Sequence, residues 1–561
     1  MNQRTRWKIL PRVPDEYLNA SGFSPLIAQL IYNRGVKPEE IDTFLFADHR
    51  LEGNPFLLPD ISQAISRIYK AVLEREKIAV YGDFDVDGVT ATVIIIEGLS
   101  RLGAEVIPYI PDRIDEGHGV KLSALEKLQS HGVSLVITVD CGVTDVVEVK
   151  QAREMGIDMI ITDHHIPLRN LPQAIAIVDP KRKDSVYPYP DLAGAGVAFK
   201  VLQALFHKDS REKWISRLMD LVVLATVTDL VPLVGENRYL VKEGLRELNK
   251  SSRVGIQEMI KLTRLKLGEL DAEDISWVLG PRLNAAGRMN NASSSYQLLT
   301  TQSSEESHLL ALELEEKNAE RQKLTSEVLS QAREKLTPKL HLPVLIDADE
   351  SYSVRVIGLV AGRLADEFYR PAIIINVGPE LCQGSCRSIP EFDFTAVLEE
   401  CHNLLVAFGG HPLAAGFTVA RQNLAQLQER IVTLATKQLA HLELRPEIVI
   451  DADVPLSILT GDTFNIIQKL SPFGRGNPQP TFLTRQVEVV ECRNFGKQGA
   501  WLRLKLKQGN ITWQAVDFKS RKTKKEIPSH IDIVYNLEKS RWNGEEVISL
   551  NLLDFAPAKL R

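Results

Sequence analysis

The region from about residue 75 to about residue 180 alternates between two patterns of hydrophobic and polar residues. Short uninterrupted apolar runs are separated by longer stretches in which apolar residues recur every three or four positions. The runs are typical of buried strands in a parallel sheet, and the longer stretches are typical of amphipathic helices. The predicted strands are KIAVYGD, AEVIPYI, VSLVITVD, IDMIITD and AIAIVD. The pattern predicts a doubly wound α/β domain, in which ligands bind at the carboxyl ends of the strands.

Different patterns precede and follow this domain. The first 50 residues are mostly polar and predict helices, of which SPLIAQLIYNRG is the clearest. After residue 300, a long charged stretch without helix breakers predicts either a surface helix or a rigid connector between two lobes. A second α/β pattern begins at LPVLIDAD. The tail from about residue 484 alternates apolar and polar residues, which predicts a small antiparallel barrel.

We therefore predict an N-terminal helical segment, a large α/β domain, a connecting helix, a smaller α/β domain and a barrel. Their predicted bounds are 1–50, 51–305, 306–340, 341–445 and 446–561. A length of 561 residues is too great for one domain and agrees with several.

Composition and charge exclude some classes of protein. No apolar run reaches the 18 or so residues of a membrane span, and the N-terminus lacks the apolar core of a secretory signal. The five cysteines contain no CxxC pair, which predicts reduced thiols in a cytoplasmic protein and disfavours a zinc cluster. The net charge of −6 argues against an evenly basic, duplex-coating surface but permits local basic grooves.

Three aspartates follow the first predicted strand in the sequence YGDFDVDGVT. Asp83, Asp85 and Asp87 lie between a strand and a helix, where alternating acids direct at least two carboxylates into one crevice. Gly88 lets the chain turn into the helix. Calcium loops also use such a string, but the twelfth position from Asp83 is Ile94 rather than glutamate. The calcium-loop alternative is therefore disfavoured.

Further acids and two histidines follow the later strands. Asp140 ends VSLVITVD, Asp163-His164-His165 ends IDMIITD, and Asp229 lies in the apolar stretch LVVLATVTDLVPL. A single acid at a strand end is more often a helix cap or a solvated group, but four positions on one edge are hard to explain as caps. Carboxylates with one or two imidazoles suit Mn²⁺ or Mg²⁺, and paired ions of this kind assist phosphoryl displacement.

These motifs resemble those of a known superfamily. GDFDVDG, TVDCG, TDHH and TVTDLVPL are similar to the four acidic motifs of the DHH phosphoesterases, and GPRLNAAGRM is similar to an additional motif of the RecJ branch. GSCRS and AFGGHPLAAGF resemble the associated DHHA1 domain. LSPFGRGNPQPTF and YNLEKSRWNGEEVISLNLLDF resemble the OB-type domain of that branch. The resemblance runs from about residue 50 to the C-terminus.

The resemblance implies a fold and a function. It implies a doubly wound parallel-sheet DHH domain, a smaller α/β DHHA1 domain joined to it by a long helix, and a C-terminal OB-type β-barrel. The implied activity is that of a single-stranded-DNA-specific 5′→3′ exonuclease, which releases 5′-mononucleotides by two-metal-ion hydrolysis in DNA recombination and repair. The implied partners are single-stranded DNA and a helicase or single-strand-binding protein, with no membrane, and we expect a monomer.

The resemblance also implies roles for the acids and histidines. The implied metal ligands are Asp83, Asp85, Asp87, Asp140, His164, His165 and Asp229. Asp140 would bridge two ions, and His165 would bind metal or the substrate phosphate. Asp163 would orient the histidines, and Asp83 would occupy a supporting or looser metal position. The catalytic group is thus Asp163, His165 and Asp140.

A second set of residues is predicted to bind the nucleic acid. The implied phosphate ligands are Arg113, Arg282, Arg288, Ser385, Arg387, Ser388 and His411. We expect Arg282 and Arg288 to flank a turn, where an arginine fork suits phosphate. Each arginine alone is as readily a structural ion-pair partner, and His411 alone reads as a buried structural histidine. Aromatic stacking on the barrel is predicted for Trp501, Trp513 and Trp542 beside the basic loop FKSRKTKKE, with core tryptophans and a solvated loop as the alternative.

Two positions depart from the family pattern. The Trp-His-x-Gly string that usually begins the second lobe is replaced by Tyr352-Ser353-Val354-Arg355. Related pyrophosphatases place a histidine ligand where this chain has Tyr81, so one of the two ions is expected to be held weakly.

Three alternative functions remain open. One is a phosphoesterase of very short oligonucleotides or phosphoadenosine phosphate, although such enzymes commonly lack the barrel. Another is a silent scaffold, although Asp85, Asp87, Asp140 and Asp229 are all present. The third is a binding module with a structural metal, for which an oxygen-dominated site at an open sheet edge is a poor match.

Overall fold

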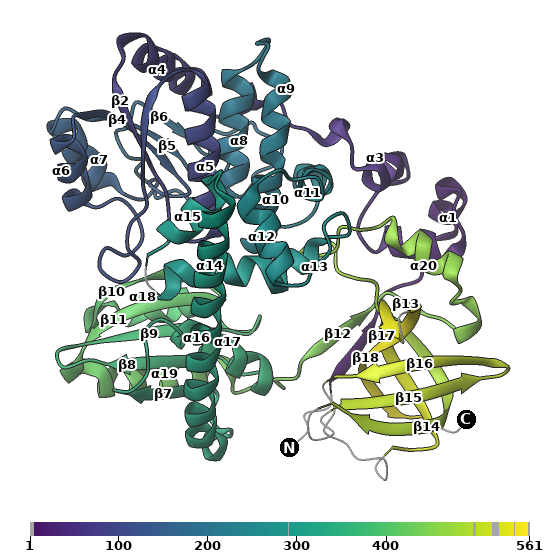
Figure 1. Cartoon of the computed structure of the whole chain (residues 1–561). Helices are drawn as coiled ribbons and strands as arrows, with labels where there is room; N and C mark the ends of the chain where they lie inside the picture. The colour runs from purple at the N-terminus through teal and green to yellow at the C-terminus, as the bar shows by residue number, and fades with distance from the viewer. Residues whose placement is uncertain (1–4, 290, 497–500, 519–526, 543–544, 559–561) are drawn as a thin grey trace.

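The computed structural model describes residues 5–289, 291–496, 501–518, 527–542 and 545–558. Figure 1 shows two α/β lobes, one above the other, and a barrel beside the lower lobe. The long helix α16 runs down one side of both lobes. The predicted fold class is thus confirmed.

The upper lobe is built on a five-stranded sheet in the order β3-β2-β4-β5-β6, in which all neighbouring strands are parallel. Its strands are β2 (Lys77–Tyr81), β3 (Glu105–Tyr109), β4 (Val133–Val139), β5 (Asp158–Thr162) and β6 (Ala176–Val178). They coincide with the five predicted apolar runs. Because the strands are parallel, the residues that follow β2, β4 and β5 meet at one edge.

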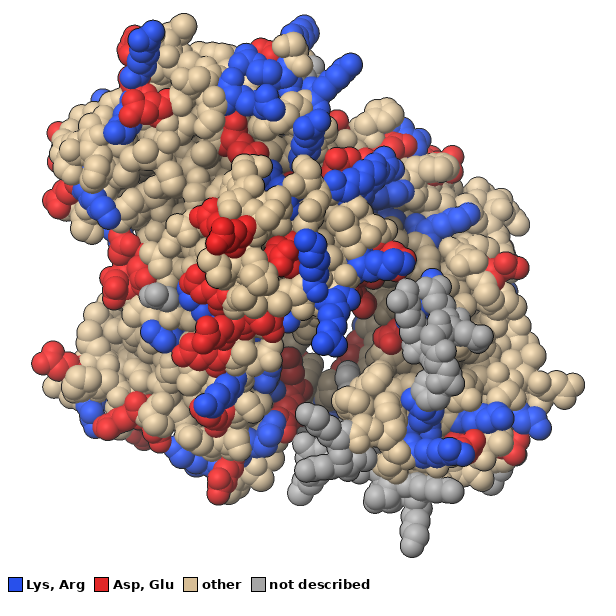
Figure 2. Space-filling model, viewed as in Figure 1, with Lys and Arg blue, Asp and Glu red and all other residues tan. Residues whose placement is uncertain are grey.

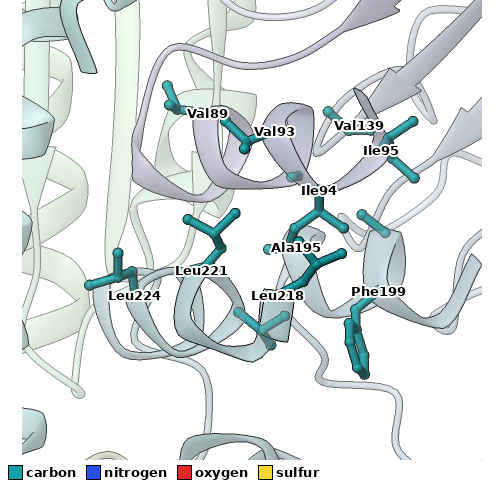
Figure 3. Close-up of a cluster of buried hydrophobic side chains, with 14 of the residues drawn as sticks. Val89, Val93, Ile94, Ile95, Val139, Ala195, Phe199, Leu218, Leu221 and Leu224 are labelled. Carbon is teal, nitrogen blue, oxygen red and sulfur yellow. The ribbon is translucent and has the colours of Figure 1, made fainter. Parts of the chain in front are cut away.

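Helices cover both faces of this sheet. One face packs against α4 (Ile61–Glu74), α5 (Val86–Arg101) and α8 (Gly194–Leu205). The other packs against α6 (Leu122–Ser130) and α7 (Val146–Glu154). Figure 3 shows the contact of α5 with α8 and with α10 (Met219–Thr228), made by aliphatic side chains. This packing fixes the start of α5, where the first acidic motif lies.

Further helices extend the lobe, and α16 leaves it. They are α9 (Glu212–Ile215), α11 (Gly235–Leu248), α12 (Val254–Leu262), α13 (Ala272–Asp274), α14 (Gly280–Met289) and α15 (Ser293–Thr300). Helix α16 (Ser304–Leu336) begins after Ser303, whose hydroxyl accepts a hydrogen bond from the Glu306 amide at 3.2 Å. Its first half packs on the upper lobe and its second half on the lower lobe, so it is the predicted connector.

The lower lobe has a mixed sheet in the order β10-β11-β9-β8-β7. Its strands are β7 (Leu345–Asp349), β8 (Ala372–Val377), β9 (Leu381–Arg387), β10 (Leu405–His411) and β11 (Ala414–Ala420). Its helices are α17 (Ile357–Phe368), α18 (Phe394–Glu400) and α19 (Leu424–Leu439). Helix α17 covers one face of the sheet, and α18 and α19 cover the other.

The C-terminal sheet closes into a barrel, because β14 pairs with both β15 and β17. The strands are β13 (Ala452–Asp453), β14 (Phe482–Phe495), β15 (Trp501–Gln508), β16 (Ile511–Asp517), β17 (His530–Trp542) and β18 (Glu545–Pro557), with helix α20 (Gly461–Gln468) beside them.

The N-terminal segment belongs structurally to the barrel. Strand β1 (Arg6–Ile9) pairs in parallel with β12 (Glu447–Ile450). Helices α1 (Asp15–Ser21), α2 (Pro25–Tyr32) and α3 (Ile41–Phe46) follow, and apolar residues of α2 and α3 share a core with the barrel. The segment therefore contains a strand as well as the predicted helices.

A buried arginine joins the upper lobe to the barrel. Arg238, on α11, donates hydrogen bonds to the carbonyl oxygens of Phe44 at 2.8 Å, Leu470 at 2.9 Å and Ser471 at 2.8 Å. Asn477 donates to the carbonyl of Leu470 at 2.8 Å. The loop before β14 is therefore fixed on the upper lobe.

Two sequence-based expectations concern the chain as a whole. None of the helices in the described ranges combines the length and hydrophobicity needed to cross a membrane. All five cysteines are buried and none of them forms a disulfide, in agreement with the prediction of reduced thiols.

Candidate active site

The first acidic motif is held in a tight turn between β2 and α5. Asp85 caps α5, and its carboxylate accepts hydrogen bonds from the amides of Asp87 at 2.9 Å and Gly88 at 3.2 Å. A Cβ on Gly88 would lie 2.5 Å from the backbone nitrogen of Asp83. The glycine predicted at this turn is therefore required by a close backbone approach.

The start of helix α8 fixes the next acid. The carboxylate of Asp87 accepts hydrogen bonds from the amides of Gly194 and Ala195, each at 2.6 Å. A Cβ on Gly194 would lie 2.7 Å from the Cβ of Asp140. The backbone at the start of α8 thus touches two carboxylate residues of the site, and the helix dipole stabilises their negative charge.

Asp140 and His164 form the centre of the site. Asp140 follows β4 with φ at 60°, a left-handed conformation that is strained for a residue other than glycine and is common at functional sites. Its carboxylate lies 2.9 Å from Nε2 of His164. His164 Nδ1 lies 3.8 Å from the Asp229 carboxylate at the end of α10. The four predicted strand-end and helix-end positions are therefore brought together.

Asp163 orients both histidines. Its buried carboxylate accepts hydrogen bonds from the amide of His164 at 2.7 Å, the amide of His165 at 3.1 Å and Nδ1 of His165 at 2.8 Å. Burial opposes ionisation, but the hydrogen bond from His165, the charges of both histidines and the amide of Val143 together outweigh it and lower the pKa of Asp163 to about 2. Burial likewise opposes the charge on His165, yet Asp163 raises the pKa of His165 to about 9.

The carboxylates of the site crowd one another. Burial and the neighbouring carboxylates raise the pKa values of Asp85, Asp87 and Asp140. Burial, together with the charge of Asp85, raises the pKa of Asp229 to about 7. Such a cluster of buried acids is stabilised when divalent cations bind.

The residues present fit two divalent cations. Three groups of residues each offer ligand atoms that lie within 4.8 Å of one another inside the group. The groups are Asp83, Asp85 and Asp140; Asp87, His164 and Asp229; and Asp140, His164 and His165. Oδ1 of Asp83 and Nδ1 of His164 are buried without a hydrogen-bond partner. Oxygen-rich sets with an imidazole suit Mn²⁺ or Mg²⁺, and the unpaired atoms are those that such an ion would satisfy.

A group of arginines borders the Asp83–Asp85 end of the cluster. The guanidinium of Arg113 lies 5.0 Å from the ring of Phe84, within electrostatic range of Asp83 and Asp85. Burial and the nearby charges of Arg113, Arg321 and Arg387 lower the pKa of Arg288 to about 9. In the described part of the chain, no carboxylate lies within 4.0 Å of Arg113 or Arg288. Half-buried guanidinium groups without a carboxylate partner favour binding of an anion.

Comparisons with known proteins agree with this site. The model of the DHH family, N-terminal domain, matches residues 77–226, the DHHA1 domain matches 340–437 and the RecJ OB domain matches 450–554. The single-stranded-DNA-specific exonuclease RecJ of Bacillus subtilis is 35% identical over 562 residues, which cover 99% of this chain and 71% of that protein. The chain belongs to the RecJ family of single-stranded-DNA-specific exonucleases.

Solved RecJ structures have the same architecture. RecJ from Thermus thermophilus in complex with Mn²⁺ has a TM-score of 0.85 and 28% identity, covering 100% of this chain and 81% of that chain. Its complex with Mg²⁺ has a TM-score of 0.79 and 27% identity, covering 99% of this chain and 79% of that one. The metals in these relatives are the two predicted for this RecJ family member.

The remaining predicted phosphate ligands have different surroundings. Arg387 donates to the Ser385 hydroxyl at 3.2 Å and belongs to the group of arginines around Arg288. Ser388 donates to the carbonyl of Phe392 at 2.6 Å. His411 is exposed at the end of β10, so the alternative of a buried structural histidine is wrong.

Arg282 differs from the expectation of an arginine fork beside a turn. Arg282 and Arg288 both lie in helix α14, and Nε of Arg282 is paired with Glu315 of α16 at 2.5 Å. The predicted turn is therefore wrong. The role of Arg282 in phosphate binding stays a prediction, and the pair with Glu315 ties α14 to the connecting helix.

The barrel presents an aromatic group. Trp501 is 38% exposed, and its ring centroid lies 5.5 Å from that of Phe495 and 5.4 Å from that of Phe518. Trp513 packs partly buried against the barrel core, as in the alternative interpretation. The Trp542 side chain and the basic residues 519–526 lie outside the described part of the structure. Of the two barrel tryptophans that the structure describes, Trp501 has the exposure that stacking requires.

The two departures from the family pattern have structural explanations. The Tyr81 hydroxyl donates to the carbonyl of Gly119 at 3.1 Å, so this side chain fixes the loop after β3. Tyr352 is buried and donates a hydrogen bond to Asp347. Each tyrosine therefore has a structural partner of its own.

Three residues that contact or influence the site were not predicted from the sequence. Asn284 of α14 accepts a hydrogen bond from the Val86 amide at 3.1 Å and so holds the start of α5. Lys181 and Arg475 carry positive charges close enough to lower the pKa of Asp229. Lys181 follows β6 and could have been found by the strand-end rule. Arg475 lies in a loop of the barrel region, and only the tertiary fold brings it to the site.

Proposed function

We propose that this RecJ family member is a single-stranded-DNA-specific exonuclease that hydrolyses DNA from the 5′ end and releases 5′-mononucleotides. The observation that carries the proposal is the position of the group formed by Arg113, Arg288 and Arg387 at one end of the carboxylate cluster. A terminal phosphate bound there would lead the chain directly across the acids. Three guanidiniums suit the high charge of a terminal phosphate better than that of an internal phosphodiester.

The proposed mechanism uses two groups of ligands that share Asp140. Asp83, Asp85 and Asp140 would hold one cation, and Asp87, His164 and Asp229 would hold the other with Asp140. When bound, the ions supply Lewis-acid stabilisation of the phosphate charge and make water a better nucleophile. Tyr81 replaces a histidine ligand of related enzymes, so we propose that the first ion is held more weakly.

The protein groups around the ions would position the substrate. Asp163 fixes the ring of His165 through Nδ1, which leaves Nε2 for a metal or a phosphate oxygen. The amides of Gly194 and Ala195 hold Asp87 in one orientation, so little reorganisation is needed when substrate binds. Ser385, Ser388 and His411 of the lower lobe would contact the strand from the opposite side.

The arrangement of the domains favours single strands. Figure 2 shows acidic and basic side chains intermixed on this face, with a hollow between the lower lobe and the barrel. An evenly basic surface that would hold duplex DNA is absent from the described residues on this face. We propose that a single strand passes between the lobes and stacks on Trp501, where base–aromatic stacking is insensitive to sequence.

The wider assignments also remain proposals. They comprise a monomeric cytoplasmic protein acting in DNA recombination and repair, with a helicase or a single-strand-binding protein as partner. They also comprise the division of the chain into domains and connecting segments at residues 1–50, 51–305, 306–340, 341–445 and 446–561.

The test is digestion of a single-stranded oligonucleotide labelled at its 5′ or its 3′ end, in Mn²⁺ or Mg²⁺. Immediate release of a 5′-labelled mononucleotide, with matched duplex spared, supports the proposal. Asp140→Ala should abolish release, whereas Asp366→Ala, an exposed acid on α17, should not change it. Rapid loss of phosphoadenosine phosphate with intact DNA would move the protein to the short-substrate enzymes. Binding of single strands without cleavage would favour the scaffold.

A further inference from the structure

We propose that Arg475 binds a backbone phosphate on the 3′ side of the cleaved bond and so guides the strand from the site toward the barrel. The inference rests on the proposed exonuclease function and adds a specific contact to it. Arg475 lies in the loop between α20 and β14, about 245 residues along the chain from Asp229.

The loop that carries Arg475 is held firmly on the upper lobe. The Leu233 amide donates to the Arg475 carbonyl at 2.7 Å, and Nη1 of Arg475 donates to the carbonyl of Leu230 at 3.4 Å. A Cβ on Gly474 would lie 2.7 Å from Cδ1 of Leu233, and Gly476 adopts a φ of 78°. The glycines on either side therefore allow the loop to approach the residues that follow Asp229.

Buried polar contacts keep this loop from moving. The side chain of Arg238 binds the carbonyls of Leu470 and Ser471, while Asn477 donates to those of Leu470 and Pro472, each at 2.8 Å. Asn477 in turn accepts a hydrogen bond from Nε of Arg34 at 2.7 Å. Arg475 is thus an exposed side chain on a preorganised support, which lowers the entropic cost of ligand binding.

The charge of Arg475 is uncompensated and faces the site. Within the described ranges, no carboxylate lies within 4.0 Å of its guanidinium. Its Nη1 donates to the carbonyl of Leu230 at 3.4 Å, and Leu230 directly follows the candidate metal ligand Asp229. Arg485, ten residues further on, is different, because Asp453 at 2.7 Å and Asp532 at 3.8 Å neutralise it.

The positions of the cations define a path for the strand. Arg113 lies over the ring of Phe84, the residue between Asp83 and Asp85, and Gly287, the neighbour of Arg288, also approaches Phe84 closely. Arg475 contacts the carbonyl of Leu230 beside Asp229, which belongs to the other group of metal-ligand atoms. If the 5′ phosphate occupies the first end, the chain beyond the cleaved bond leaves past Arg475.

The experiment measures binding of a 5′-phosphorylated, 3′-fluorescent oligonucleotide by anisotropy in a chelator, where no cleavage occurs. Arg475→Ala should raise Kd roughly five- to tenfold, as for the loss of one solvent-exposed hydrogen bond. The slope of log Kd against log salt should fall by about 0.7, the value for one phosphate of a single strand. Arg475→Lys should restore the slope, and Arg485→Ala should leave both quantities unchanged.

The position of the contact is tested with uncharged methylphosphonates placed singly along the strand. When the methylphosphonate stands at one internal position, on the 3′ side of the first bond, Arg475→Ala and the wild-type protein should bind the oligonucleotide with equal Kd. An equal Kd for Arg475→Ala and wild type on unmodified DNA would overturn the inference, as would a loss that maps to the 5′-terminal phosphate. If the wild type does not cleave single strands at all, the proposed function fails instead, so the two failures are distinguishable.

Discussion

Gly194→Ala should inactivate the enzyme without unfolding it. The added methyl group would lie 2.7 Å from the Cβ of Asp140, whereas carbon atoms in contact prefer about 3.5–4.0 Å. Asp140 or the start of α8 must therefore move by about 1 Å. A displacement of that size in a catalytic group costs roughly a hundredfold in rate. The accompanying overpacking should cost about 1–3 kcal/mol of stability.

Gly196→Ala provides a matched control two residues further along α8. A Cβ at this position would lie 3.5 Å from the Cβ of Leu192, which is ordinary contact, and alanine favours a helix over glycine by about 1 kcal/mol. The assay is kcat for release of 5′-labelled mononucleotide, with thermal unfolding of each variant measured in parallel. A Gly194→Ala protein that is folded and retains the wild-type kcat would refute the argument that this glycine positions Asp140.

Three further results are expected. The Asp163–His165 pair stabilises the fold most between about pH 4 and pH 6.5. Below this range Asp163 binds a proton as the pH falls toward its pKa of about 2, and above it His165 loses a proton as the pH rises through its pKa of about 9. The loss of Tm caused by Asp163→Asn in chelator should therefore be greatest near pH 5 and shrink at pH 3 and pH 10; a constant loss would contradict the pairing. Asp140→Asn removes one charge from the crowded acids, so the free energy of unfolding of the metal-free protein should rise by about 1 kcal/mol. The increase of Tm on addition of Mn²⁺ should become smaller, and an undiminished increase would argue against Asp140 as a ligand. Arg288→Ala should raise KM for a 5′-phosphorylated strand roughly tenfold to a hundredfold and for a 5′-hydroxyl strand much less; equal effects on the two strands would place Arg288 elsewhere on the path.

The part of the site that follows the parallel strands is predictable from sequence. Asp83, Asp140 and Asp163 lie just after apolar runs, and the rule that parallel strands end on one edge brings them together. Helical and strand periodicity likewise predicts the two lobes, the connector and the barrel. These features depend on local sequence patterns, and the structure confirms them.

The remainder depends on contacts between distant segments. Asn284 is 198 residues from Val86, whose amide it binds, and nothing near either residue indicates the pairing. The glycine in GPRLNAAGR predicts a turn, yet Gly287 lies within α14. The reason is that a Cβ there would overlap the carbonyl oxygen of Phe84, so the glycine allows helix and acidic loop to touch. A glycine is needed where two backbones approach closely as well as where the chain turns, and the sequence alone does not distinguish the two cases.

The pairing of β1 with β12 affects how the chain is made. Strand β1 leaves the ribosome before its partner Glu447–Ile450, which follows about 440 residues later. At synthesis rates of about 5–20 residues per second, β1 waits roughly 20–90 s with its backbone unpaired. The hydrophobic faces of α2 and α3 wait equally long for the barrel core. Completion of the N-terminal segment is therefore a late event in synthesis, and nascent chains that stop before the barrel would expose this segment to chaperones and proteases.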